Sequence, residues 1–443
     1  MLTLKQAAQW CGGTVLKEYE NVAFQGAEND SRKIQAGQLF VALKAARDGH
    51  DFIGKAMEAG AAAALGERQL PGVPMLVVPD SLTALQEIAA GWRSTLTGTR
   101  FIGLTGSVGK TTTKEMTAAA CAAVYRTRWT QANFNNEIGV PRTLLDLDPD
   151  TEAAVVEMGM NHAGELSRLT SLARPDVAVI TNVGSMHIEN LGSREGICKA
   201  KLEILEGLAP DGTAVLHGDE PLLRAAAPAC RTLWFGLGPD NDLRAEEVQL
   251  TPTGSAFTAV GLGQRVRVTL PAPGQHNVIN ALAAMLAAHC VGVPLETAAR
   301  ALGSFVNTGD RLRTYQQGGY TIIADCYNAG PESMEAAFTV LGSLPTEGRR
   351  IAVLGDMLEL GDFAPAAHRK VGAQAATAAD RILAYGPLSR ELTAAAGEKA
   401  LHFDSREALL EALRAEAKPG DVLLFKASHG MHLEMVLDGF FNR

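Results

Sequence analysis

The pattern of apolar positions divides the chain into short apolar runs separated by longer segments with helical spacing. From about residue 100 onward the runs are rich in β-branched residues: FIGLTG, AAVVEMG, VAVITNVG and TAVLHGD. Such runs, separated by helical stretches, are typical of a parallel sheet covered by helices. Between about residues 240 and 270 apolar and polar residues alternate around glycines, which predicts antiparallel strands. An Ala-rich helix, NVINALAAMLAAHC, is expected next.

The same alternation predicts a domain on each side of this region. Residues 1 to about 80 mix QLFVAL and PMLVVP with Ala-rich helical patterns, which indicates a small α/β module. Near the C-terminus YTIIADCY, IAVLGDM, RILAYG and DVLLFKAS predict a Rossmann-like unit. A chain of 443 residues also exceeds the size of a single core, about 250–300 residues. We therefore expect an α/β protein of three domains, at 1–80, 81–308 and 309–443.

Composition and charge narrow the class of protein. The formal net charge of -9 argues against a general nucleic-acid binder. Six cysteines without C-x-x-C spacing fit neither a disulfide framework nor a zinc site. The N-terminus lacks the layout of a signal peptide, and no apolar run reaches the roughly 18 residues of a membrane span. The sequence thus predicts a soluble cytoplasmic protein.

The segment GLTGSVGKTTTKEM has the features of a phosphate-binding loop. It joins an expected strand to an expected helix, so backbone N–H groups and the helix N-terminus can hold anionic phosphates. Lys110 would neutralise the outer phosphates, and the Thr111 hydroxyl would bind Mg²⁺. Leu104 replaces the first glycine of the strict pattern, so a plain glycine turn remains the alternative. The nucleotide-binding prediction covers Gly106, Ser107, Val108, Gly109, Lys110, Thr111 and Thr112.

Polar residues follow most of the other expected strands. In open α/β sheets ligands bind at the carboxyl ends of the strands, so these residues are expected to cluster. Glu157 suits magnesium, which prefers oxygen ligands, whereas His187 could equally be a loop histidine bonded to the backbone. The expected cluster comprises Lys110, Thr111, Glu157, Thr181 to His187, Asp325, Asp356 and Lys426.

Lys201 interrupts an apolar stripe in SREGICKAKLEILEGL. On a helix it shares a face with Ile197, Ile204, Leu205 and Leu208. A buried ammonium is costly and its pKa falls, so such a lysine either extends its charged end to water or takes part in chemistry. Spacing alone leaves both alternatives open.

These residues and several further motifs resemble the ATP-dependent Mur ligases. The resemblance covers about residues 30 to 435. Within the family, the sequence is most similar to the branch that adds a D-Ala-D-Ala dipeptide. The motifs are DSRKIQAGQLFVAL, TGSVGKTTTKEM, NFNNEIGVPRTLL, EMGMNHAGEL, TNVGSMHIENLGS, KAKLEI, QHNVINALAA, ADCYNAGPESM, LGDMLELG and KASHGMHLE.

The resemblance implies a UDP-sugar-binding N-terminal domain, a central P-loop ATPase domain and a C-terminal domain for the incoming dipeptide. ATP, with Mg²⁺, would phosphorylate the terminal carboxylate of UDP-MurNAc-tripeptide, and the amine of D-Ala-D-Ala would attack the acyl phosphate. This reaction belongs to peptidoglycan precursor synthesis. A monomer without nucleic-acid partners is the family expectation.

The resemblance also assigns roles to single residues. Catalysis is expected from Lys110, Glu157, His187 and Lys201, with metal binding by Thr111, Glu157, His187 and a carbamylated Lys201. Further ATP contacts are expected from Asn277, Asn280, Arg311, Asp325, Tyr327 and Asn328. Asn277 could also cap its helix, and Arg311 could simply be solvated. Substrate contacts are expected from Ser31, Arg32, Asn135, Asn136, Lys426 and Ser428. His429 stands where the family often has arginine.

Three alternatives remain. One is a sibling ligase that adds a single lysine or diaminopimelate to UDP-MurNAc-dipeptide; the absence of D-N-P-R fits the dipeptide branch and some lysine-adding siblings. Another is a ligase similar to folylpolyglutamate synthetase. The third is a non-catalytic protein switched by nucleotide, which the presence of Glu157, His187 and Lys201 disfavours.

Overall fold

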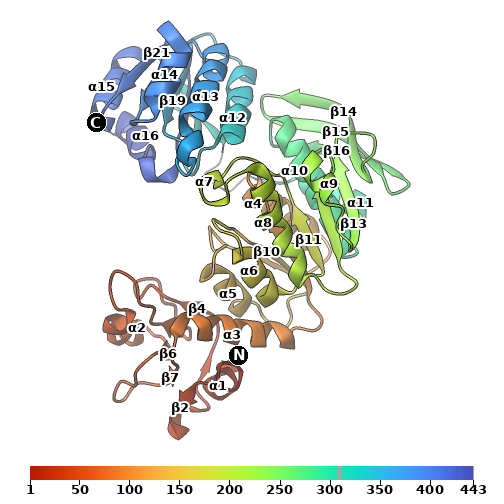
Figure 1. Cartoon of the computed structure of the whole chain (residues 1–443), viewed down its shortest axis with the longest axis vertical. Helices are drawn as coiled ribbons and strands as arrows, with labels where there is room; N and C mark the ends of the chain where they lie inside the picture. The colour runs from red at the N-terminus through yellow and green to blue at the C-terminus, as the bar shows by residue number, and fades with distance from the viewer. Residues whose placement is uncertain (307–311, 443) are drawn as a thin grey trace.

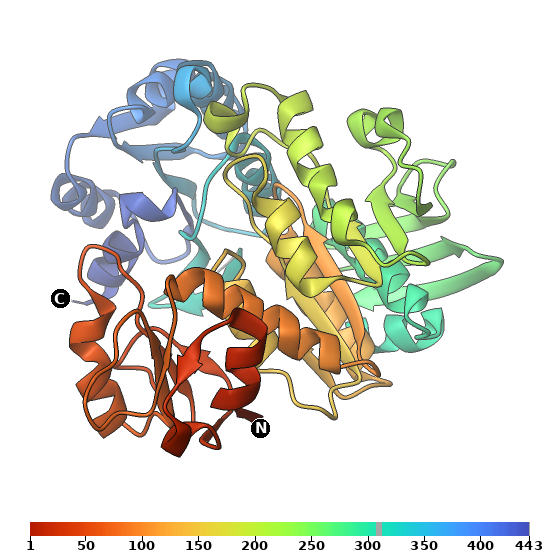
Figure 2. The same ribbon diagram turned by 60° about the horizontal axis from the view of Figure 1, so that its bottom comes forward.

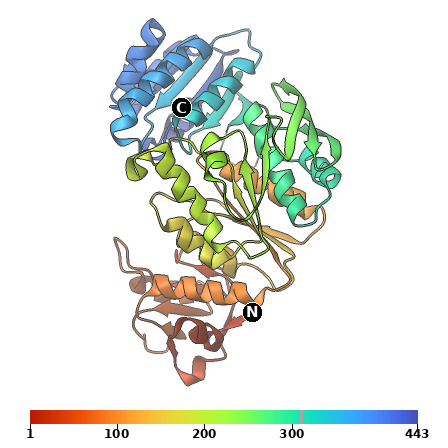
Figure 3. The ribbon, with the colours of Figure 1, turned by 45° about the vertical axis from the view of Figure 1, so that its right-hand side comes forward.

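A computed structural model describes residues 1–306 and 312–442. It contains three α/β units in a row, with the N-terminal and C-terminal units at opposite ends of the central one (Figures 1 and 3). The expectation of three α/β domains is therefore confirmed. The boundary at 308/309 falls on residues outside the described part, and the boundary at 80/81 remains a prediction. Every described helix is too short or too polar to cross a lipid bilayer.

The N-terminal unit has a five-stranded sheet of order β2-β7-β6-β5-β4 and a separate pair, β1 with β3. Strands β4 to β7 run parallel, and β2 is antiparallel to β7. Its strands are β1 (Leu2–Thr3), β2 (Thr14–Val15), β3 (Ala23–Phe24), β4 (Ala27–Glu28), β5 (Leu39–Val41), β6 (Ala63–Gly66) and β7 (Met75–Val77). Its helices are α1 (Leu4–Cys11) and α2 (Ile53–Glu58), and α3 (Ser81–Thr95) packs against both this unit and the central one.

The central unit is built on a nine-stranded sheet of order β16-β15-β14-β13-β12-β11-β8-β10-β9. Strands β8 to β14 pair in parallel, and the predicted antiparallel extension is β14 to β16 at one edge (Figure 2). The strands are β8 (Arg100–Thr105), β9 (Thr127–Trp129), β10 (Ala153–Glu157), β11 (Val177–Ile180), β12 (Thr213–His217), β13 (Arg231–Gly236), β14 (Leu243–Thr251), β15 (Gly254–Gly261) and β16 (Gln264–Leu270).

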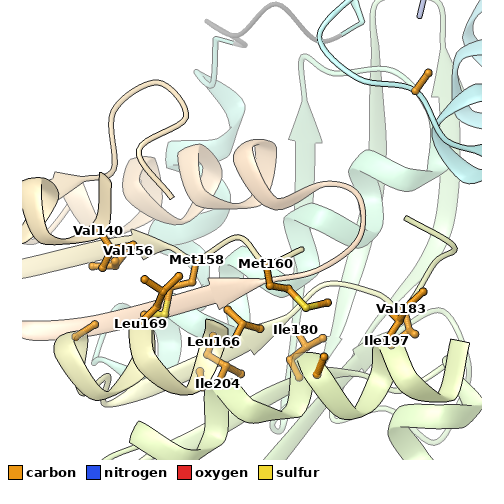
Figure 4. Close-up of a cluster of buried hydrophobic side chains, with 14 of the residues drawn as sticks. Val140, Val156, Met158, Met160, Leu166, Leu169, Ile180, Val183, Ile197 and Ile204 are labelled. Carbon is orange, nitrogen blue, oxygen red and sulfur yellow. The ribbon is translucent and has the colours of Figure 1, made fainter. Parts of the chain in front are cut away.

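Helices cover both faces of this sheet because its strands are apolar on both sides. Alternate residues of β10 enter different cores: Val155 belongs to the core that also contains residues of α4 and α10, and Val156 to the core that also contains residues of α5 and α6. Figure 4 shows the second core, where Val156, Met158, Leu166 and Leu169 converge. The helices are α4 (Lys110–Ala122), α5 (Gly139–Leu145), α6 (Glu165–Ala173), α7 (Ile188–Leu191), α8 (Arg194–Leu202), α9 (Pro221–Ala226), α10 (Gln275–Cys290) and α11 (Leu295–Gly303).

The C-terminal unit has a six-stranded sheet of order β17-β18-β22-β19-β20-β21, parallel except for β17. Its strands are β17 (Arg313–Gln317), β18 (Tyr320–Asp325), β19 (Arg350–Gly355), β20 (Arg381–Tyr385), β21 (Ala400–Phe403) and β22 (Val422–Lys426). Its helices are α12 (Pro331–Ser343), α13 (Ala364–Ala378), α14 (Ser389–Ala396), α15 (Arg406–Glu416) and α16 (Glu434–Phe441). The sheet thus has the expected Rossmann-like layering, with β18 and β22 as neighbours.

Candidate functional site

A cavity of about 610 Å³ lies between the central and C-terminal units. This volume falls within the usual range for small-molecule sites, roughly 300–1,000 Å³. The central unit contributes the loop after β8, the loop after β11 and the start of α10, and the C-terminal unit contributes the ends of β18 and β22. The predicted residues that line it are Ser107, Val108, Gly109, Lys110, Thr112, Thr181, Asn182, Val183, Gly184, Met186, Asn277, Asn280, Asp325, Asn328 and Lys426.

The predicted phosphate loop joins β8 to α4 at the floor of this cavity. Gly109 has φ 79°, and a Cβ there would lie 2.6 Å from Asn280 Oδ1. At Gly106 a Cβ would meet Thr181 Oγ1 at 1.8 Å, so glycine is required at both positions. Lys110 Nζ donates to the carbonyl oxygen of Gly106 at 2.7 Å. The alternative of a plain turn does not explain why the loop faces a cavity.

The end of β11 braces the phosphate loop. Asn182 Oδ1 accepts from the backbone N–H of Val108 at 3.0 Å, and Asn182 Nδ2 donates to the Val108 carbonyl oxygen at 2.8 Å. Ser107 Oγ accepts from the backbone N–H of Gly184 at 2.8 Å. These bonds hold the end of β11 against the loop that follows β8, its neighbour in the sheet. Open α/β sheets bind their ligands at such strand ends. Asn182 falls within the expected cluster of Thr181 to His187, although no role of its own was predicted for it.

Glu157 ends β10 beside the phosphate loop and is fully buried. Its Oε1 accepts from Asn135 Nδ2 at 2.8 Å and from Thr111 Oγ1 at 3.4 Å. Its Oε2 lies 3.7 Å from Lys114 Nζ and has no hydrogen-bond partner among the described residues. A buried carboxylate oxygen without a hydrogen bond, close to a threonine hydroxyl, fits a hard cation such as Mg²⁺. Sequence reasoning missed Lys114, which follows Lys110 by one helical turn.

Lys201 lies on α8 with its side chain 1% exposed. This burial rules out the alternative of a lysine that reaches solvent. None of the described residues pairs with its ammonium. Burial and the charge of Lys110 hold the pKa of Lys201 well below its usual range. The predicted helix ends at Leu202, however; Ile204 and Leu205 of the stripe lie in a 3-10 helix over Glu203–Gly207, and Leu208 follows it.

His187 lies at the boundary with the C-terminal unit. Its Nδ1 lies 2.7 Å from Glu359 Oε2. That contact lowers the pKa of Glu359. Among residues 1–306 and 312–442, no three His, Cys, Asp or Glu side chains cluster closely enough to hold a metal ion. The expected metal set therefore remains a prediction.

The start of α10 supplies the two asparagines expected on the adenine side. Asn277 Nδ2 donates to the carbonyl oxygen of Pro273 at 2.8 Å, and Asn280 Nδ2 donates to Asn277 Oδ1 at 3.3 Å. Gly274 is the N-cap, so the alternative of Asn277 as the helix cap is wrong. The neighbouring His276 also lines the cavity, and burial lowers its pKa to about 4.

The C-terminal wall contains a buried ion pair. Lys426 Nζ lies 2.5 Å from Asp325 Oδ2 and also donates to the carbonyl oxygen of Asn328 at 2.9 Å. Tyr327 instead stacks on His429, with ring centroids 5.9 Å apart. Arg311 lies outside the described residues.

Two other polar residues of the C-terminal unit serve its internal structure. Asp356 Oδ1 accepts from the backbone N–H of Ser389 at 2.7 Å, so its expected place in the ligand cluster is wrong. An aspartate at a strand end can either bind a ligand or cap a helix of its own domain, and its position in the sequence does not tell these two roles apart. Ser428 Oγ accepts from the backbone N–H of Leu358 at 2.9 Å.

The residues expected to contact the sugar nucleotide are distributed over two units. Ser31 and Arg32 lie in the N-terminal unit, where Arg32 pairs with Asp30 at 2.7 Å. Asn135 contacts Glu157, as described above, and Asn136 Oδ1 accepts from the backbone N–H of Gly139 at 2.9 Å at the start of α5. The structure therefore does not bring Ser31 and Arg32 into the cavity between the other two units.

Three family models match the chain. They are the Mur ligase family catalytic domain over residues 24–93, the Mur ligase middle domain over 104–288 and the Mur ligase glutamate ligase domain over 310–429.

Individual relatives match over nearly the whole length. The UDP-N-acetylmuramoyl-tripeptide–D-alanyl-D-alanine ligase of Bacillus subtilis is 43% identical, covering 98% of this chain and 97% of its own. A crystal structure of MurF from Acinetobacter baumannii has a TM-score of 0.91 at 32% identity, covering 100% and 99%. MurF ligase from Thermotoga maritima, solved in complex with ADP, has a TM-score of 0.82 at 30% identity, covering 94% and 97%. This chain belongs to the Mur ligase family.

Proposed function

We propose that this chain is an ATP-dependent amide ligase that joins D-Ala-D-Ala to UDP-MurNAc-tripeptide and releases ADP and phosphate. One observation supports it above all: a cavity of nucleotide size is lined from one side by the phosphate loop and from the other by the C-terminal unit. Full-length relatives carry this activity in their names. The product would be a precursor of peptidoglycan.

The reaction proceeds in two steps. A carboxylate oxygen of the tripeptide attacks the γ-phosphorus of ATP, the bond to ADP breaks, and an acyl phosphate forms. The amine of D-Ala-D-Ala then attacks the acyl carbon, phosphate leaves, and the amine loses a proton. Phosphoryl transfer depends on positioning and charge neutralisation, which Lys110 and the backbone N–H groups of the loop provide.

The other residues divide between nucleotide and substrates. Asn277 and Asn280 would face adenine, and Asp325, Tyr327 and Asn328 would complete the nucleotide side from the C-terminal unit. Ser31 and Arg32 would hold the uridine diphosphate, whereas Asn135 and Asn136 would meet the muramoyl-peptide. Lys426 and Ser428 would lie near the incoming dipeptide. Arg311, which the family places at the phosphates, belongs to the same proposal.

Magnesium would be held by Thr111 and Glu157, with His187 and a carbamylated Lys201 as further ligands. When bound, the ion would neutralise charge on the phosphate oxygens. Carbamylation adds CO₂ to a neutral amine with loss of one proton, and the low pKa of Lys201 supplies that neutral amine.

Phosphate release from ATP tests the proposal. Purified protein is given UDP-MurNAc-tripeptide and D-Ala-D-Ala, and each acceptor is omitted in turn. We expect sustained release only with both. Release with UDP-MurNAc-dipeptide and a single amino acid would instead indicate a sibling ligase, and no release with any pair would favour a non-catalytic role.

A further inference from the structure

Lys114 is a buried charged residue that the proposed reaction does not use. It lies on α4, one helical turn after Lys110, and its side chain is 1% exposed. Its Nζ is 3.7 Å from Glu157 Oε2, and the Glu157 side chain is also 1% exposed. A buried ion that loses its partner is strongly destabilising, so each of these charges depends on the other.

The two oxygens of Glu157 have different surroundings. Oε1 accepts hydrogen bonds from Asn135 and Thr111, whereas Oε2 accepts no hydrogen bond from any described residue and lies near the ammonium of Lys114. A divalent cation bound to this carboxylate would place a second positive charge close to the buried ammonium of Lys114. Charges interact strongly in such a water-poor site. The Lys114 ammonium therefore attracts the Glu157 carboxylate before a cation binds, and it repels the cation once the cation is bound.

We propose that Lys114 is a positioning residue that holds the Glu157 side chain in place before the cation arrives and lowers the affinity of the site for that cation. The proposal rests on the proposed function, because Glu157 must be a metal ligand. A weaker hold on the ion shortens its residence, so that the ion exchanges more readily between turnovers.

The test measures Mn²⁺ binding by electron paramagnetic resonance with the full chain and saturating ADP. Lys114→Met is expected to bind Mn²⁺ about tenfold more tightly than the unchanged chain, because the repelling ammonium is gone. Without metal its melting temperature should fall, and MnCl₂ with ADP should stabilise it more than they stabilise the unchanged chain. Lys199→Met, at an exposed position of α8, is the matched control and should change neither quantity.

Two results would overturn the proposal. Mn²⁺ affinity of Lys114→Met that is unchanged within twofold, or weaker, would show that Lys114 does not oppose the cation. An equal loss of melting temperature with and without metal would show a purely structural role. If Lys114→Met does not fold, the double variant with Glu157→Gln, which removes both charges, must fold, and its failure would also overturn the proposal.

The single variant Glu157→Gln separates this proposal from the proposed function. It should lose most Mn²⁺ affinity. Unchanged affinity in that variant would contradict Glu157 as a metal ligand, whatever Lys114→Met does.

Discussion

At the scale of single residues, Lys201 carries the clearest chemical consequence. An amine that is buried, unpaired among the described residues and low in pKa can react with CO₂. Lys201→Ala is expected to lower kcat by about 10- to 100-fold, the range typical for damage to a metal site. Added acetate should restore part of the rate by supplying a carboxylate.

The carbamate itself can be observed in the unchanged chain. With ¹³C-bicarbonate, NMR should show one carbamate signal that Lys201→Ala lacks, while exposed Lys199→Ala retains it. A Lys201→Ala variant with full activity, with or without bicarbonate, would refute this role.

His276 predicts a loss of stability in acid. Its pKa is about 4 in the folded chain, compared with the ordinary value of 6.5. Burial is the main cause of this lowering; the charge of Asp325 acts to raise the pKa, and the charge of Lys426 lowers it further. Between pH 6.5 and 4 the unfolded chain therefore binds a proton that the folded chain does not, and the free energy of unfolding falls as pH falls. The loss totals about 3 kcal/mol across this window and is absent above pH 7.

Urea unfolding at pH 7 and pH 4.5 measures this loss. His276→Gln should lose less stability than the unchanged chain on going to pH 4.5. Identical losses in the two chains would contradict the shifted pKa.

Helical spacing placed Lys201 on a buried face, but it could not reveal Lys114. In the sequence, Lys114 is simply one polar residue on the second turn of a helix, and its burial depends on Glu157 at the end of strand β10. Similarly, nothing in the sequence near Asp356 indicates that the start of α14 lies within its reach. Residues whose role depends on a distant partner were the ones that local patterns missed.

At the scale of elements, the phosphate loop depends on Gly109. Gly109→Ala would place a side chain at φ 79° and 2.6 Å from Asn280 Oδ1. We expect the free energy of unfolding to fall by about 1–3 kcal/mol and ADP affinity to fall at least about tenfold. Calorimetric ADP titration checks this; Gly98→Ala, where a Cβ meets open space, is the control. Unchanged ADP affinity would contradict the loop's role.

Helix α5 joins the central unit to the N-terminal sheet through Arg142. Arg142 Nη2 lies 2.6 Å from Glu28 Oε2, and Glu28 Oε1 accepts from the backbone N–H of Asp30, next to Ser31. Arg142→Met leaves Glu28 buried and unpaired, so we expect a loss of about 3 kcal/mol in stability. The KM for UDP-MurNAc-tripeptide should rise more than kcat falls.

Steady-state kinetics and urea unfolding check both effects. The double variant with Glu28→Gln removes the unpaired charge and should recover most of the stability. A double variant no more stable than Arg142→Met would contradict the ion-pair explanation.

Strand positions were predictable from sequence because buried parallel strands are continuous apolar runs, as in β8, β10 and β11. The end of α8 at Leu202 was not, since apolar spacing continues into the 3-10 helix that follows.

At the scale of the whole molecule, the site is assembled by contacts between units. Ser185 donates to Glu332 from its hydroxyl and its backbone N–H, both at 3.0 Å, and Glu189 accepts from the backbone N–H of Gly361 at 3.0 Å. Together with the His187–Glu359 pair, they place the C-terminal unit over the phosphate loop. No sequence pattern predicts these contacts, because each joins residues more than 140 positions apart.

The central claim is that the γ-phosphate of ATP passes to a carboxylate of the sugar-peptide. UDP-MurNAc-tripeptide labelled with ¹⁸O in its peptide carboxylates tests it most directly, in a reaction with ATP and D-Ala-D-Ala. Mass spectrometry of the released phosphate should show one ¹⁸O atom per molecule, because the acyl C–O bond breaks when the amine attacks. Phosphate without ¹⁸O, formed alongside the ligated product, would contradict the acyl-phosphate route.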